Sequence, residues 1–254
     1  MSSCGFLQAW LLLFLLSSNL PCSGQSVRGK ASVVMDPGEV DDRKIIEYEL
    51  NDPKCFETSD ELRQAVNRYE GMNKFDSKLA AQFGWPIGRW CVSNVEDFSN
   101  LFSSARHHRY FNEPLDLWDM SRATNVSGMF QNCHWFNQPL SSWKLRNVKT
   151  MSRMFAAARS FNQPIGTWQV DSVQDMSYMF LHAFSFHQDL NSWNIASVTS
   201  MEGMFRDARS FDSSQLQWDV SHVTNIDRMV SEIPGVTLNL RGHYEQQTVI
   251  TMTG

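Results

Sequence analysis

The sequence predicts an α/β repeat solenoid, because three columns of aromatic residues recur with one period. Five tryptophans are spaced 25 residues apart, and Trp90 lies 28 residues before the first of them. Two phenylalanine series keep the same spacing. The three columns are Trp118, Trp143, Trp168, Trp193 and Trp218; Phe130, Phe155, Phe180 and Phe205; and Phe111, Phe136, Phe161, Phe186 and Phe211. One unit cannot bury so many aromatic side chains alone, whereas stacked units can bury a continuous core.

Each unit is expected to contain one short strand and one short helix. Residues 150–158, TMSRMFAAA, carry apolar residues at i, i+3 and i+4 spacing among good helix formers, which predicts a helix there and at the equivalent place in other units. Residues 139–145, PLSSWKL, carry apolar residues two apart and predict a strand. The FNQP segment between them is typical of a turn.

The remaining sequence divides into flanking segments. We expect a cleaved signal peptide at residues 1–24, since the apolar run from Trp10 to Leu16 is shorter than the roughly 20 residues of a membrane-spanning helix. The other segments are an acidic linker (25–57), a helical N-terminal cap (58–89), about six repeats (90–230) and a C-terminal cap or tail (231–254). In the cap, Thr58 and Glu61 form a capping-box pattern that predicts a helix from Thr58 to Tyr69, and a second helical stretch follows from about Asp76 to Phe83.

The repeated motifs resemble those of a known family. Trp, Val-Thr, Met-x-x-Met-Phe and Phe-Asn-Gln-Pro-Leu recur in the order found in BspA-like surface proteins, which carry 25-residue repeats of the mycoplasma-lipoprotein type. The resemblance implies a leucine-rich-repeat-like solenoid with a helical lead-in. It also implies an extracellular protein associated with cell surfaces, adhesion or protein interaction, and it implies no enzyme.

Composition and spacing argue against several classes of function. The formal charge of −5 and the pI near 5.8 do not suit a nucleic-acid-binding protein. No carboxylate pair recurs in the column after the tryptophans, so we expect no catalytic residues, and histidine and cysteine spacing predicts neither a metal site nor a cofactor. The column Asn112, Asn137, Asn162, His187 and Asp212 could bind calcium, but bonds to the turn backbone of each unit are the favoured interpretation.

One surface feature is a candidate binding site. Arginines in or just after the predicted helices could form a basic stripe for an anionic glycan or an acidic protein, although an ordinary solvated surface is the simpler interpretation. The candidate ligand-binding residues are Arg153, Arg159, Arg206 and Arg209.

Three further residues or pairs carry expectations about covalent chemistry. Cys55 and Cys91 flank the lead-in helices, and a disulfide between them and two separate thiols are equally open alternatives. Cys133 occupies a column of alanines and is expected to be a buried thiol. Asn125 begins an N-glycosylation sequon, which matters only in a eukaryotic secretory pathway.

The function expected from the sequence is therefore non-catalytic. We expect a secreted or cell-surface, monomeric binding or adhesion module whose partner is an extracellular protein or glycan, with no membrane span in the mature chain. The alternative is a structural spacer of a cell wall or extracellular matrix.

Overall fold

The structure is a computed structural model that describes residues 30–32, 47–49, 54–71, 77–103 and 108–231. The predicted signal peptide, and most of the predicted linker and tail, lie outside the described residues. The chain divides into two compact units, Met1–Pro53 and Lys54–Gly254.

In the first unit, strands β1 (Lys30–Ser32) and β2 (Glu47–Glu49) pair antiparallel, with Ala31 opposite Tyr48.

The second unit begins with two helices, α2 (Ser59–Gly71) and α3 (Ser77–Phe83), followed by the short 3₁₀ helix η1 (Ile87–Arg89). Thr58 Oγ1 accepts a hydrogen bond from the Glu61 amide at 3.1 Å, as a capping box requires. The Glu61 carboxylate, however, accepts from the amide of Glu57, at 3.0 Å. The apolar face of α2 is buried and consists of Leu62, Ala65, Val66 and Tyr69.

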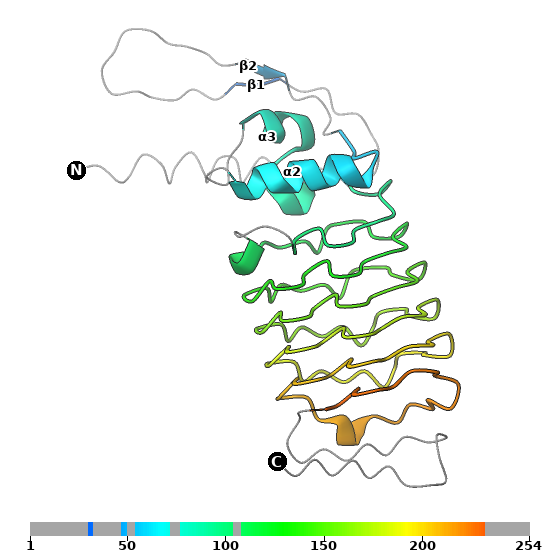
Figure 1. The fold of residues 1–254 in the computed structure, drawn as a ribbon. Coiled ribbons are helices and arrows are strands. Elements are labelled where there is room, and N and C mark those ends of the chain that lie inside the picture. The colour runs from blue at the N-terminus through cyan, green and yellow to red at the C-terminus, as the bar shows by residue number, and fades with distance from the viewer. Residues whose placement is uncertain (1–29, 33–46, 50–53, 72–76, 104–107, 232–254) are drawn as a thin grey trace, which may run out of the picture. The chain divides into compact units, whose positions relative to one another are not determined.

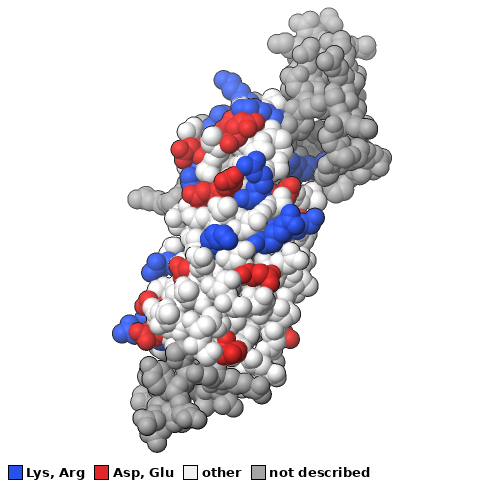
Figure 2. Space-filling model, turned by 90° about the vertical axis from the view of Figure 1, so that its right-hand side faces the viewer, with Lys and Arg blue, Asp and Glu red and all other residues white. Residues whose placement is uncertain are grey.

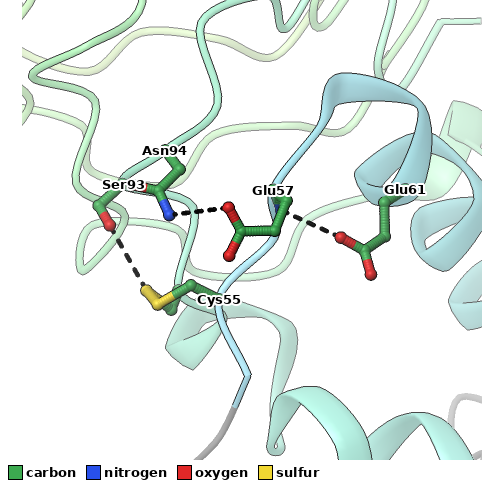
Figure 3. The surroundings of a disulfide bond; sticks show 6 residues. Cys55, Glu57, Glu61, Ser93 and Asn94 are labelled. Carbon is green, nitrogen blue, oxygen red and sulfur yellow. Dashed lines mark hydrogen bonds between the residues drawn. A yellow bond between two sulfur atoms is a disulfide. The ribbon is translucent and has the colours of Figure 1, made fainter.

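A disulfide links the start of this unit to the first repeat. Cys55 and Cys91 are bonded, with their Cα atoms 4.5 Å apart. Figure 3 shows that polar side chains surround the bond, and Asn94 Nδ2 donates to Glu57 Oε2 at 3.5 Å. The Phe56 amide also donates to the carbonyl of Cys91 at 2.9 Å. Two segments that are 36 residues apart in sequence are thus joined covalently and by hydrogen bonds.

After η1 the chain forms successive coils stacked on one another (Figure 1). One residue of each coil forms an isolated parallel bridge with the next coil. This bridge column consists of Asp97, Asn125, Thr150, Asp175, Ser200 and Asn225. Within residues 90–103 and 108–231 the structure has no α-helix and no β-strand, only the short 3₁₀ helices η2 (His108–Tyr110) and η3 (Ser213–Gln215). The predicted α/β solenoid of one strand and one helix per unit is therefore wrong.

The predicted helix does not form because its amides bond to the next coil. Within residues 150–158, the amides of Arg153, Phe155 and Ala157 donate to carbonyls about one unit later in the chain, at 2.9, 2.9 and 2.6 Å. Arg153 and Ala157 both have φ of 57°, in the left-handed region that a right-handed helix excludes. The apolar spacing therefore reflects turns that point side chains inward.

The predicted strand does not form either, because tight turns replace it. The Trp143 amide donates to Leu140 O at 3.1 Å, and the Val148 amide donates to Leu145 O at 3.0 Å. Such bonds between residues three apart close turns, whereas a strand would need a neighbouring strand for each of these groups.

The core of the stack consists of the aromatic columns on which the sequence analysis depended. Phe155 lies between Phe130 and Phe180, with ring centroids 5.6 and 5.7 Å away and nearly parallel planes. Trp143 and Trp168 stack in the same way at 6.4 Å. Such pairs contribute about 0.5–1.5 kcal/mol each beyond the burial of their area. The repeat itself is therefore present, although its backbone differs from the prediction.

Candidate binding surface

The tryptophans also bond to the backbone of the preceding coil. Each indole Nε1 donates to a buried carbonyl in the coil before it: Trp143 to Leu115 O and Trp168 to Leu140 O, both at 2.9 Å. Trp118, Trp193 and Trp218 make the corresponding bonds to Ile87, Ile165 and Leu190. Each of these carbonyls also accepts a turn amide of its own coil, so the indole is a second donor that joins the next coil to it, and this tryptophan column is structural.

The asparagine column (Asn112, Asn137, Asn162, His187 and Asp212) is structural in a related way. Asn112 Oδ1 accepts from the Asn137 amide and Asn137 Oδ1 from the Asn162 amide, both at 2.9 Å, and Asn162 Oδ1 accepts from the His187 amide at 3.0 Å. The expected bonds to turn backbone are therefore present: Asp212 Oδ1 bonds within its own unit, to the Ser214 amide at 3.0 Å, whereas the three asparagines bond to the next unit. Among the described residues, no group of three or more His, Cys, Asp or Glu side chains could hold a metal ion.

A third column faces outward and is built of cations and aromatic rings. We call Arg109, His134, Arg159, Phe184 and Arg209 the arginine–aromatic column. Each member from His134 onward directly follows a small buried residue, Cys133 or an alanine, which forms a tight turn. The coils are held in register here because the Ser160 amide donates to His134 O and the Ser185 amide to Arg159 O, both at 3.1 Å.

Neighbouring members of this column contact one another through their side chains. Arg109 Nε donates to His134 Nδ1 at 3.0 Å. The guanidinium groups of Arg159, in the preceding unit, and Arg209, in the following unit, lie over the Phe184 ring, 5.4 and 4.5 Å from its centroid. Cations over an aromatic face are attracted by its quadrupole, so side-chain contacts join Arg159, Phe184 and Arg209 in one group and Arg109 and His134 in another.

This arrangement favours the neutral form of His134. Partial burial lowers its pKa, and the positive charges of Arg159 and Arg109 lower it further. Because Nδ1 accepts the Arg109 hydrogen bond, it carries no proton of its own. The upper part of the column, which is its N-terminal part from Arg109 to Arg159, therefore has two arginine charges with an uncharged ring between them.

In the lower, C-terminal part of the column, Arg209 is paired with a carboxylate. Arg209 Nε donates to Asp207 Oδ1 at 2.8 Å, and His182 Nδ1 lies 2.9 Å from Asp207 Oδ2. Burial would raise the pKa of Asp207, but the bonds from Arg209 and His182 outweigh it and the pKa lies below its usual value. The charge of Arg209 is thus partly neutralised, whereas Arg159 forms no ion pair with a described residue.

Two exposed aromatic residues lie beside Arg109. Tyr110 and Trp135 are 65% and 61% exposed, with ring centroids 6.1 Å apart, and we call them the aromatic pair. Arg109 lies 6.0 Å from the Tyr110 ring centre. This pair was not predicted from the sequence. The available signal was that Trp135 falls outside the 25-residue tryptophan series and that later units have Ser160, Ser185 and Ser210 in its column.

The four arginines predicted from the sequence lie in three different columns of the repeat. Arg159 and Arg209 share the arginine–aromatic column, on either side of Phe184. Arg153 belongs to another column and lies 4.7 Å from the ring centre of Tyr178, whose hydroxyl donates to Glu202. Arg206 belongs to a further column and is half-buried. On the face drawn in Figure 2, basic and acidic side chains are interspersed over the coils.

The remaining predicted site residues have distinct environments. Asn125 is half-buried in the bridge column, and its Oδ1 accepts from the Ser127 amide at 2.9 Å, so glycosylation there stays a prediction. Cys133 is confirmed as a buried thiol, and its Sγ lies 3.4 Å from Phe102 O. The part of the chain that the structure describes contains no helix long and apolar enough to cross a membrane.

These features define a repeat protein whose inner columns hold the coils together and whose outer columns vary in residue type. The chain belongs to the family described as Mycoplasma protein of unknown function, DUF285, whose model matches residues 54–160 and again residues 141–243. No curated protein matched the chain, and no solved structure matched it either.

Proposed function

We propose that this chain is a non-catalytic, secreted or cell-surface binding module of the BspA-like kind, acting as a monomer on an extracellular protein or glycan. The observation that carries the proposal is the contrast between columns. The inner columns repeat one residue type because each unit needs the same packing. The arginine–aromatic column and the aromatic pair instead vary from unit to unit, and they leave two large aromatic rings in contact with solvent.

Exposed aromatic residues and arginines are the side chains that most often anchor binding partners. Tyr, Trp and Arg are enriched among residues whose truncation weakens an interface strongly. Here Tyr110, Trp135 and Arg109 lie within one surface region, and their ring contacts fix their relative positions. This region supports binding better than catalysis, because the interactions of His134 within the described residues are with arginines and not with a carboxylate or nucleophile.

A structural spacer is the second candidate, and the ladders between coils favour it. Backbone, indole and asparagine bonds join each coil to the next, which suits a stiff rod. A spacer would have no saturable ligand of its own, so a binding experiment separates the two functions.

The test is a pull-down from extracellular proteins and cell surfaces together with a glycan array, at low and raised salt. Saturable binding by the full secreted chain supports a binding module. We expect Arg159→Glu to weaken it about tenfold or more, since the reversed charge repels an anionic partner. Arg146→Glu is the matched control, an exposed arginine of the same unit outside the arginine–aromatic column. Absence of binding by the unaltered chain contradicts the proposal and favours the spacer.

A further inference from the structure

We propose that the arginine–aromatic column and the aromatic pair bind a linear acidic polysaccharide that carries one anionic group per disaccharide. The inference rests on the proposed binding function and specifies its partner. The chain of the polysaccharide would run along the stack, crossing the coils. Its carboxylate or sulfate groups would meet the arginines, and one sugar ring would lie on the aromatic pair.

The spacing of the arginines supports this partner. Arg109, Arg159 and Arg209 occur in alternate units, with His134 and Phe184 in the units between them. Coils joined by parallel bridges are separated by about 4.8 Å, so alternate arginines lie roughly 10 Å apart along the column. In an extended polysaccharide, successive sugars turn over, and equivalent groups return to the same side once per disaccharide, at a similar distance. A charge on every sugar would match this column less well.

The side chains between the arginines suit uncharged sugar surfaces. The Phe184 ring lies under the guanidinium groups of Arg159 and Arg209 and separates these two cations with an uncharged side chain, and the neutral form of His134 is favoured between Arg109 and Arg159; the open ring faces are those of the aromatic pair. Sugar rings have apolar C–H faces that pack on flat aromatic rings, while their hydroxyl groups bond to polar neighbours. The alternation of cation and ring therefore matches the alternation of anionic and neutral sugars.

The upper part of the column is the stronger half of the proposed site. Arg159 has Phe184 and His134 as column neighbours, whereas Arg209 is already bonded to Asp207. The aromatic pair also lies at this upper end, beside Arg109. We therefore expect a short oligosaccharide to occupy the region from Arg109 to Arg159, and a longer one to gain contacts toward Arg209.

An acidic protein segment is the main competing partner, and the aromatic pair distinguishes the two. A flexible acidic peptide could pair with the arginines but has no flat apolar face that repeats with them. It would therefore bind without needing Trp135, and it would lose most of its affinity in raised salt.

The experiment measures binding of the full chain to fluorescent hyaluronan oligosaccharides by anisotropy. Hyaluronan carries one carboxylate per disaccharide. The comparison probes are hyaluronan with its carboxylates reduced to alcohols, and polyglutamate. The variants are Arg109→Gln, Arg159→Gln and Trp135→Ala, with Arg146→Gln as the control in the same unit as Arg159. Circular dichroism and a melting curve show whether each variant is folded.

We expect saturable binding that strengthens from tetrasaccharide to octasaccharide. Arg109→Gln and Arg159→Gln should each weaken it about tenfold, the loss of one charge-assisted contact. Trp135→Ala should weaken it by a similar factor, and Arg146→Gln should leave it unchanged. The reduced polymer and polyglutamate should bind at least tenfold more weakly.

Equal binding of polyglutamate or of the reduced polymer overturns the inference, and so does hyaluronan binding that survives all three column variants. A chain that binds extracellular proteins or neutral glycans but not hyaluronan also overturns it, yet leaves the proposed binding function intact. If the chain binds nothing in either experiment, both proposals fail together.

Discussion

The tryptophan column and the arginine–aromatic column both place one side chain in each successive unit, but they use it differently. Each tryptophan is buried and donates to a backbone carbonyl of the preceding coil, a partner that is the same in every unit. Members of the outer column contact side chains instead, and the residue type changes from Arg to His to Phe. A hydrogen bond to a backbone carbonyl requires the same side-chain donor in every unit. A contact between two side chains allows the residue types of both partners to change together.

The largest effect on stability is expected from a substitution that interrupts the tryptophan column in the middle of the stack. Trp168→Ala removes a buried ring that stacks on Trp143 and Trp193, and it removes the indole hydrogen bond to Leu140 O, which still accepts from the Trp143 amide. We expect the free energy of unfolding to fall by about 3–5 kcal/mol, as for other buried Trp→Ala changes. Urea denaturation followed by circular dichroism measures it.

Trp168→Phe separates the two contributions in that column. It keeps a stacked ring but removes the indole donor, so the loss should be smaller than for Trp168→Ala. If both variants cost less than about 1 kcal/mol, the column does not hold the coils as described.

A smaller effect is expected from the asparagine column. Asn137 Oδ1 accepts from the Asn162 amide at 2.9 Å and from Gln163 Nε2 at 3.0 Å. Asn137→Ala removes this oxygen and both of its hydrogen bonds, and we expect a loss of about 1–2 kcal/mol in denaturant titrations. Asn137→Asp keeps the acceptor oxygen and should retain most of the stability, and equal losses in the two variants would contradict the assigned bonds.

The outer column should respond to pH through His134. Its pKa is lower in the folded chain than in the unfolded chain, because burial, Arg159 and Arg109 all disfavour the charged imidazolium. The unfolded state therefore binds the proton first, and stability is retained above the unfolded pKa of about 6.5 but declines as pH falls below it. Melting curves between neutral and mildly acid pH measure the decline. The slope should be shallower in His134→Gln, and an unchanged slope would show that His134 does not contribute.

The smallest expected effect sharpens the contrast between the columns. Arg159 is exposed, and its contact with Phe184 is one cation over a ring at the surface. Arg159→Gln should change the free energy of unfolding by no more than about 0.5 kcal/mol, as for most surface substitutions. A loss comparable to that of Asn137→Ala would assign a structural role to Arg159 and weaken the case for binding.

The repeat and its buried residues could be predicted from sequence because aromatic spacing reports burial directly. The backbone conformation could not be predicted in this way. Apolar residues at Met151, Met154 and Phe155 have helical spacing, but the same inward positions arise when residues such as Arg153 adopt positive φ and amides bond to the next coil. Spacing within one unit cannot distinguish these cases, since the deciding hydrogen bonds join residues roughly one unit apart.

The candidate surface was predictable only in part for a related reason. Arg159 and Arg209 could be found because arginine recurs in their column after the alanines. Trp135 and Tyr110 escaped attention because an aromatic residue in this sequence is usually buried, and only the fold shows that their column faces outward.

Equivalent hydrogen bonds between coils join residues with the same sequence separation in successive units, and this affects how such chains can evolve. The Phe130 amide bonds to Met154 O, and the Phe155 amide bonds to Met179 O in the same way, both at 2.9 Å. Loss of residues 143–167 would bring Met179 to the place of Met154, and duplication would insert an equivalent partner. Gene length can therefore change by whole units without redesign of the interior, and the outer columns are lengthened or shortened at the same time.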